Sequence, residues 1–203
     1  TSIIQEALEK SYLVDANFVE CAENVTYTAT TITLGGKVVR NNHRVALLGE
    51  YGQSNLYGLF VSDDSNLVDN HTLMNHQVPN CESNELYKGI LKSKSTGVFN
   101  GKIFVQKDAQ KTNAYQSSKN ILLSDDATIN TKPELEIYAN DVKCSHGTST
   151  GKIDEEALFY LKSRGIGEKS GRNLLLYAFA SEVIDKINPE ELRDYVSSKI
   201  SIL

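Results

Sequence analysis

The sequence predicts a mainly β chain that ends in a small helical domain. Fifteen of the 17 Asn and ten of the 13 Gly precede residue 154. In that region, short apolar and β-branched runs are bounded by Asn, Asp, Gly and Ser, a pattern typical of strands and turns. From Asp154 onward, apolar residues recur at helical spacing instead. We therefore expect a β domain over residues 1–153 and a helical domain over residues 154–203.

The β region contains several short runs that we expect to be strands, and no helical period passes through them. They lie at residues 25–34, 45–48, 58–61, 98–105, 121–123 and 135–139. Such a chain fits a sandwich, a barrel or a stacked solenoid. A loose repeat gives the solenoid a small advantage: Val-Asp-Asn at 68–70 is followed by Val-Phe-Asn at 98–100 and by Ile-Asn at 129–130.

The C-terminal region predicts three short amphipathic helices. Acidic residues at 154–156 suit a first turn, where the helix dipole favours them, and Gly165 is a natural stop. A second helix is expected from about residue 168 to 187, with one apolar face made by Leu176, Ala180, Val183, Ile184 and Ile187. Asn188 as cap and Pro189 in the first turn predict a third helix. These helices either cap the β domain or also present a docking surface for a partner.

Composition excludes several classes of protein. The net charge is −5 and the sequence pI about 5.4, without the basic patch that nucleic acids or anionic membranes need. No apolar run approaches the roughly 20 residues that span a bilayer. The three cysteines, Cys21, Cys81 and Cys144, are odd in number and widely spaced, which favours a reducing compartment over a disulfide framework. We expect a cytoplasmic protein.

The best candidate for chemistry is the pair Cys144 and His146. On a strand, residues two apart point to the same face, so the thiol and the imidazole would lie side by side. Both groups are suitable ligands for iron or zinc, but a closed tetrahedral site needs four ligands. A metal here would therefore be held transiently or shared with a partner chain. Spacing alone favours a structural role, with Cys144 packed in the core and His146 bonded in a turn.

Other motifs give weaker signals. His71, His76 and Cys81 are spaced five apart, which suits no single short element, and we interpret them as polar turn residues. The adjacent acids at 63–64 and 125–126 are also expected in turns, because neighbours on a strand face opposite ways. Residues 97–103 miss the phosphate-loop pattern by one residue and end in Ile. There is no Gly-x-Ser-x-Gly nucleophile elbow.

Several longer strings resemble the SufB/SufD family of the SUF iron–sulfur cluster assembly system. They are VPNCESNELYKG at 78–89, GVFNGKIFV at 97–105, DAQKT at 108–112, NTKPELEIYA at 130–139 and DEEALFYLKSRGI at 154–166. The string DVKCSHG at 141–147 resembles the SufD branch in particular. The resemblance runs from about residue 32 to 187 and looks like the C-terminal half of a family member, without the N-terminal helical region and the earlier rungs.

The resemblance implies a right-handed β-helix followed by a helical domain. It implies a scaffold without enzyme activity that pairs with a SufB-like paralogue through the β-helices, and in isolation with itself as a possible homodimer. It places His146, and less firmly Cys144, at that interface, where an iron–sulfur cluster would be bound transiently and no cofactor stably. It also implies that the C-terminal helices dock a SufC-like ATPase, for which we expect contacts from Leu158, Tyr160, Leu161, Tyr177 and Phe179.

Three alternatives stay open. A SufB-type paralogue is disfavoured by the string at 143–147. A carbohydrate-active β-helix enzyme would need convergent acids or a calcium site, and the sequence offers neither. A purely structural β-helix protein would have no site and no partner.

Overall fold

A computed structural model describes residues 1–8 and 10–200, which form eleven strands and three helices. The strands are β1 (Ser2–Gln5), β2 (Tyr12–Cys21), β3 (Thr26–Thr33), β4 (Val38–Leu47), β5 (Gln53–Ser62), β6 (Leu67–His76), β7 (Glu82–Leu91), β8 (Thr96–Val105), β9 (Asn113–Leu122), β10 (Thr128–Ile137) and β11 (Lys143–Gly151). The helices are α1 (Glu155–Ser163), α2 (Glu168–Ile184) and α3 (Glu190–Ile200).

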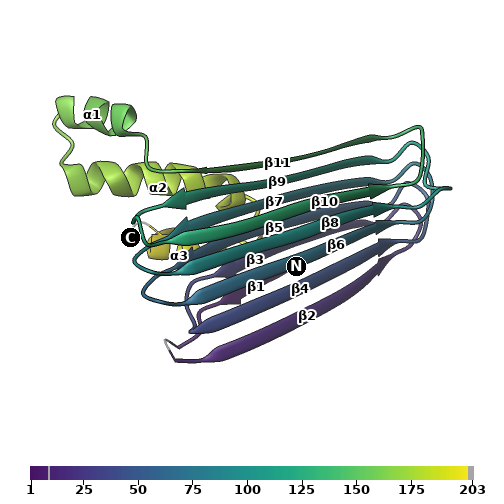
Figure 1. Ribbon diagram of the computed structural model, residues 1–203, viewed down its shortest axis with the longest axis horizontal. Coiled ribbons are helices and arrows are strands. Elements are labelled where there is room, and N and C mark those ends of the chain that lie inside the picture. The colour runs from purple at the N-terminus through teal and green to yellow at the C-terminus, as the bar shows by residue number, and fades with distance from the viewer. Residues whose placement is uncertain (9, 201–203) are drawn as a thin grey trace.

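The strands form two parallel sheets that alternate along the chain. Odd-numbered strands make a six-stranded sheet in the order β1-β3-β5-β7-β9-β11, and even-numbered strands make a five-stranded sheet in the order β10-β8-β6-β4-β2. Each turn of the chain thus adds one strand to each sheet (Figure 1). This is a parallel β-solenoid, and it confirms the predicted fold class of a β-helix followed by C-terminal helices.

The turns of the chain do repeat, but the Val-x-Asn match is out of register with them: its asparagines are offset by one residue between β6 and β8 and by two between β8 and β10. Val68 pairs with Gly97, and Asn70 pairs with Phe99 rather than with Asn100. Asn70 instead accepts a hydrogen bond at 2.9 Å from Asn41, its partner in β4 one turn earlier. Because both amides point inward, the asparagine contact lies inside the solenoid on strands and not in its turns.

Side chains alternate between the interior and the outer faces of the sheets, as the pleat requires. The interior holds an apolar cluster in which Tyr87 of β7 packs against Phe99 of β8 with ring centroids 4.8 Å apart. Glycine makes room for these rings. Gly58 pairs with Tyr87, and a Cβ at Gly58 would lie 2.2 Å from the Tyr87 ring.

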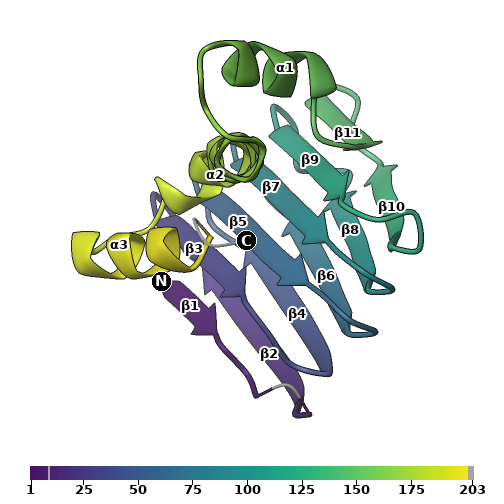
Figure 2. The ribbon, with the colours of Figure 1, turned by 90° about the vertical axis from the view of Figure 1, so that its left-hand side faces the viewer.

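Helices α2 and α3 cover the outer face of the odd-numbered sheet (Figure 2). Leu59, Val61 and Ile90 on that face share one cluster with the predicted apolar stripe of α2, namely Leu176, Ala180, Val183, Ile184 and Ile187, all of which are buried. α2 ends at Ile184, three residues earlier than predicted. Pro189 precedes α3 and accepts from the Arg193 amide, so it occupies the cap position and not the first turn.

Helix α1 begins at a side-chain cap. Asp154 accepts hydrogen bonds from the amides of Glu156 and Ala157 at 2.9 and 3.0 Å, which satisfies two of the free N–H groups at the helix start. The sequence predicted Asp154 inside the first turn, whereas it occupies the N-cap position, one residue before the helix begins. The division into domains at residue 153 stays a prediction, and the last residues of its second part, 201–203, lie outside the described residues.

β10 and β11 are the last strands of their sheets, so one edge of each has no neighbour among the described residues. In β10 the amides of Thr128 and the following Tyr138 bond to the β8 side, at Ser95 and Val105. Alternate residues of a parallel strand donate to the same side, so Pro133, at an odd position, has its nitrogen at the free edge. The proline therefore removes a donor from this edge without breaking the ladder to β8.

The close approach at Gly58 yields a stability prediction. Gly58→Ala is expected to lower the free energy of unfolding by about 1–3 kcal/mol, because the new methyl group overpacks the Tyr87 ring. Gly147→Ala on β11 is the matched control, since no atom lies within 4 Å of a Cβ there. Urea unfolding followed by circular dichroism measures both. Equal stability of the two variants would contradict the packing described for the interior.

Candidate functional site

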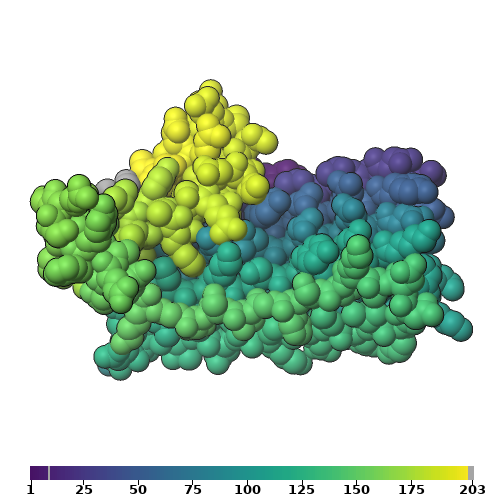
Figure 3. Space-filling view, turned by 90° about the horizontal axis from the view of Figure 1, so that it is seen from above, coloured from purple at the N-terminus to yellow at the C-terminus, as the bar shows by residue number. Residues whose placement is uncertain are grey.

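The site predicted from the sequence lies on the terminal strand β11. Cys144 and His146 are two residues apart on this strand and so share its inward face, about 6.6 Å apart along the strand. They pair with Ala114 and Gln116 of β9. The amide of Lys143 donates to Thr112 on the β9 side, so the amides of Cys144 and His146 point to the free edge. Figure 3 views the molecule from this end, with β11 in green along the surface.

The two side chains have different surroundings. Cys144 is half-buried and packs against the interior cluster, whereas His146 is exposed. Burial raises the pKa of the Cys144 thiol, and a smaller contribution from a backbone hydrogen bond at Ala114 lowers it. In this chain by itself the thiol is therefore the favoured form, and the thiolate that binds metal needs a nearby cation or the metal itself.

These two residues do not make a complete metal site. Over residues 1–8 and 10–200, no group of three or more His, Cys, Asp or Glu side chains lies close enough to hold a metal ion. Thiolate and imidazole suit iron, so an iron–sulfur cluster fits the chemistry of the pair. Further ligands would have to come from another molecule, and the free edge of β11 is the side from which that molecule has access.

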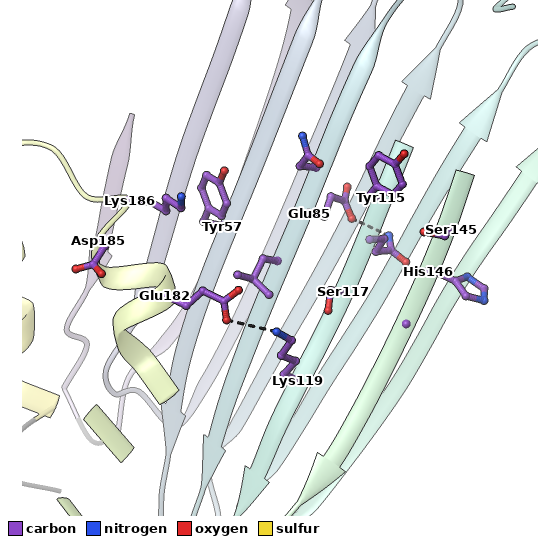
Figure 4. Close-up of a pocket in the computed structure, with 14 residues that line it drawn as sticks. Tyr57, Glu85, Tyr115, Ser117, Lys119, Ser145, His146, Glu182, Asp185 and Lys186 are labelled. Atoms are coloured by element: carbon purple, nitrogen blue, oxygen red, sulfur yellow. Dashed lines mark hydrogen bonds and ion pairs between the residues drawn. The ribbon is translucent and has the colours of Figure 1, made fainter. Parts of the chain in front are cut away.

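A groove of about 700 Å³ lies on the other face of the same strands. It runs between β11 and the end of α2, and Tyr57, Tyr115, Lys119, Ser145 and Lys186 are among its lining residues. Figure 4 shows Ser145 turned toward the Tyr115 side and the His146 ring turned away from it. His146 therefore borders the groove through its backbone, and its ring belongs to the opposite face of the sheet.

Lys88 fixes the helical side of this groove. Its side chain is 5% exposed, and its ammonium group lies 2.5 Å from the Glu182 carboxylate and donates to the Phe179 carbonyl at 2.7 Å. The same ammonium lies over the Phe179 ring, 4.5 Å from its centroid. Glu182 also accepts from Lys119 at 3.4 Å. The hydrogen bond from Lys88 lowers the pKa of Glu182 most, so this carboxylate is ionised at neutral pH.

The five residues predicted to dock an ATPase fall into different environments. Leu158 is buried against Gly171, between α1 and α2. Tyr177 and Phe179 are partly buried against the cluster beneath α2, and Leu161 is half-buried. Tyr160 is 56% exposed. Phe159 and Leu174 are also exposed, and the sequence did not lead us to expect them at a docking surface. Each lies opposite the apolar stripe of its helix, which was the pattern that could have identified them.

The interpretation of His71 and His76 as turn residues was wrong, whereas Cys81 does lie in the turn between β6 and β7. His76 ends β6 and is fully buried, with a 2.9 Å hydrogen bond to Ser83. Cys81 is also buried, and His71 lies on β6 beside Asp69 at 2.8 Å. Burial lowers the pKa of His76 to about 4, so this imidazole is neutral at physiological pH. The three residues form no common site.

The remaining motifs have structural roles. Asp125 and Asp126 lie in the turn after β9, as predicted, and Asp125 pairs with Lys152 at 2.6 Å. Residues 97–103 lie within strand β8 and form no phosphate loop. Among the described residues, no helix has the length and apolar character needed to pass through a bilayer.

Comparison with known proteins gives consistent matches. Residues 1–179 match the family model described as SUF system FeS cluster assembly, SufBD core domain. The chain is 38% identical to the iron-sulfur cluster assembly protein SufD of Escherichia coli, over 88% of this chain and 42% of that protein. It is 35% identical to the SufBD family protein ML0594 of Mycobacterium leprae, over 84% and 45% respectively. It is 34% identical to the chloroplastic protein ABCI7 of Arabidopsis thaliana, over 98% and 42%. The chain thus spans less than half the length of these relatives.

The Lys88 anchor gives a prediction for the helices. Lys88→Met keeps the apolar stem but loses the bonds to Glu182 and Phe179, so the free energy of unfolding is expected to fall by about 1–2 kcal/mol. Lys119→Met removes an exposed partner of the same carboxylate and is expected to cost less than about 0.5 kcal/mol. Urea unfolding measures both values. A loss in Lys119→Met as large as in Lys88→Met would show that Lys88 is not the anchor.

Proposed function

Because this chain belongs to the SufBD family of iron–sulfur cluster assembly proteins, we propose that it acts as a SufD-like scaffold subunit. In this role it pairs with a SufB-like paralogue and is moved by a SufC-like ATPase, while the nascent cluster is the cargo and not a resident cofactor. The carbohydrate-active alternative finds no support among these relatives. The cytoplasmic location stays a prediction from the sequence.

The observation that supports the proposal most is the position of Cys144 and His146 on the free edge of the terminal strand. The edge amides of both residues are available to an incoming strand. The side chains of both candidate ligands lie on the inward face of β11 itself. A paralogue that added a strand here would bring its own side chains next to them. The ligand set would then be shared, with two ligands from each chain making a closed site.

The chemistry assigned to each residue follows from its surroundings. His146 is exposed, so its imidazole is accessible to iron without prior movement of the chain. Cys144 is half-buried with a raised thiol pKa, so it becomes a ligand only as the metal displaces its proton. We therefore assign the larger contribution to His146 and a secondary one to Cys144. A second copy of this chain could occupy the same edge in the absence of the paralogue.

The exposed side of α1 is the proposed contact with the ATPase. Phe159 and Tyr160 are 74% and 56% exposed and adjoin each other on this helix. Leu158 and Leu161 on the opposite side pack toward α2, so movement of α1 would be transmitted to α2 and, through Lys88, to the sheet. Leu158, Leu161, Tyr177 and Phe179 would then support the docking surface from within.

Replacement of His146 tests the proposed site. In a complex reconstituted with the paralogue and the ATPase, His146→Ala is expected to lower the yield of assembled cluster about tenfold or more, because one shared ligand is lost. Size-exclusion chromatography should show the complex intact. Thr148→Ala, two residues further on the same face, is the control and should keep the wild-type yield. A wild-type yield in His146→Ala, measured by absorption spectroscopy, would remove His146 from the site.

Replacement of Tyr160 tests the docking surface. Tyr160→Asp is expected to weaken binding of the ATPase about tenfold, because an aromatic contact is replaced by a charge. Tyr51→Asp, at a tyrosine that is also 56% exposed but lies in the turn between β4 and β5, should bind as wild type does. Isothermal titration calorimetry measures both affinities. Equal affinities for the two variants would place the docking surface elsewhere.

A further inference from the structure

A carboxyl group with no charged partner lies inside the solenoid. Glu85 points inward from β7 and is 3% exposed. Two donors converge on one of its oxygens: the Thr72 hydroxyl at 2.9 Å and the Gln116 amide nitrogen at 2.7 Å, both to Oε2. No ion pair of Glu85 occurs in the part of the chain that the structure describes.

Among the described residues, Glu85 and Gln116 each have one side-chain oxygen that accepts no hydrogen bond. Glu85 Oε1 and Gln116 Oε1 are both buried, and neither has a donor within hydrogen-bond distance among residues 1–8 and 10–200. An ionised Glu85 would leave two acceptors unpaired in the interior, which is costly. One proton on Oε1 removes both defects, because the resulting hydroxyl can donate to Gln116 Oε1. The acid and the amide would then be joined by two hydrogen bonds.

The neighbours of Glu85 are neutral on every side. Thr72 of β6 and Gln116 of β9 contact it directly, and Leu56 of β5 pairs with it in the sheet. The titratable groups of the same interior include Tyr87 of β7, Tyr27 of β3, His43 of β4, His76 of β6 and the thiols of Cys21, Cys81 and Cys144. Burial raises the pKa of the tyrosines and the thiols and lowers that of the two histidines, so all of these groups are uncharged near neutral pH.

The pair lies directly below the candidate cluster site. Glu85 pairs with Gln116, and Gln116 pairs with His146, so the three inward-facing residues form one column across β7, β9 and β11. On the opposite sheet, Gly101 leaves room for the amide: a Cβ there would lie 2.4 Å from Gln116 Nε2. Gln116 is thus confined from below by Glu85 and from the side by β8.

We propose that Glu85 is held as a neutral carboxylic acid that donates its proton to Gln116 Oε1, and that this acid–amide pair positions Gln116 as the floor beneath His146. Loss of the proton removes the donor to Gln116 Oε1 and leaves the Gln116 amide held by one hydrogen bond to Glu85. The position of the Gln116 side chain therefore depends on pH. Glu85 is a positioning residue and does not touch the cargo. The link to the cluster rests on the proposed function, whereas the acid–amide pair itself does not.

The direction of the pH dependence follows from burial. Desolvation raises the pKa of Glu85 to about 7, although the hydrogen bonds from Gln116 and Thr72 oppose the shift. The unfolded value is near 4.5, so between these two values the folded state binds more protons than the unfolded state. The contribution of Glu85 to stability is therefore fully present below about pH 4.5 and is lost as pH rises toward 7.

The experiment uses the whole chain and observes Gln116, the residue that accepts the proposed hydrogen bond from Glu85. The side-chain amide resonances of Gln116 in the wild type are expected to shift with pH, with a midpoint near 7. In Glu85→Gln the shift should vanish, because an amide donates to Gln116 at every pH. Glu82→Gln, at an exposed carboxyl on the same strand, should retain it. Between pH 5 and 8 the urea midpoint should fall in the wild type relative to Glu85→Gln.

The outcomes separate the two proposals. A wild-type titration without a Gln116 shift, together with a carboxylate rather than a carboxylic-acid infrared band for Glu85 at pH 5.5, would overturn the acid–amide pair whatever the cluster yield. The wild-type measurement decides this even if Glu85→Gln does not fold. If the Gln116 resonances of the wild type shift with pH but His146→Ala keeps the full cluster yield, the acid–amide pair is supported and only its link to the proposed site is removed.

Discussion

The parallel stacking of strands, one turn above the next, is the constraint on which the rest of this structure depends. It places every inward-facing side chain over the inward-facing side chain of the turn below, so each must be compatible with its neighbours in a column. Apolar columns meet this demand by packing, as Gly58 does beneath Tyr87. Polar columns meet it by hydrogen bonds between turns, as Asn41 and Asn70 do. The interior therefore tolerates polar residues where they are paired.

The candidate site is a consequence of where that stacking stops. Cys144 and His146 occupy inward positions that in earlier turns are buried, but β11 is the last strand of its sheet among the described residues. His146 is exposed because no further turn covers it, whereas its column partners Gln116 and Glu85 are buried. Side chains at inward positions, such as His146, thus become accessible at the end of the solenoid. The buried residues of the same column, Gln116 and Glu85, lie directly beneath.

Much of the fold could be predicted from the sequence, and the errors have physical causes. Four of the five predicted stripe residues lie within α2 and Ile187 lies just beyond its end, so the period was readable from the local sequence, and all five are buried. The Val-x-Asn match was out of register because the turns differ in length: Val68 pairs with Gly97, 29 residues on, and Gly97 pairs with Ile129, 32 residues on. His76 and Cys81 looked polar in isolation, but the fold buries both: His76 bonds to Ser83 across the turn into β7, and Cys81 bonds to the Gly49 carbonyl, 32 residues earlier. The Lys88 contact joins residues 91 apart, and the groove joins residues as distant as Tyr57 and Lys186, so no local pattern marks either.

The candidate site was found by resemblance more than by physics. Spacing alone placed Cys144 and His146 on one face of a strand, which the structure bears out, but gave no reason to prefer a ligand role. That preference came from the surrounding strings, and the family match supports them. Glu85 lay within one of these strings without attracting notice, because a single acid in a strand gives no sign that its partner is an amide one turn away.

The proline in β10 has a consequence for how copies of the chain meet. Two strands end the solenoid side by side, yet Pro133 removes one donor from the free edge of β10, while β11 has no proline. An incoming chain therefore finds one complete edge and one interrupted edge at the same end. Strand addition at this end is therefore favoured at β11, beside Cys144 and His146, over β10.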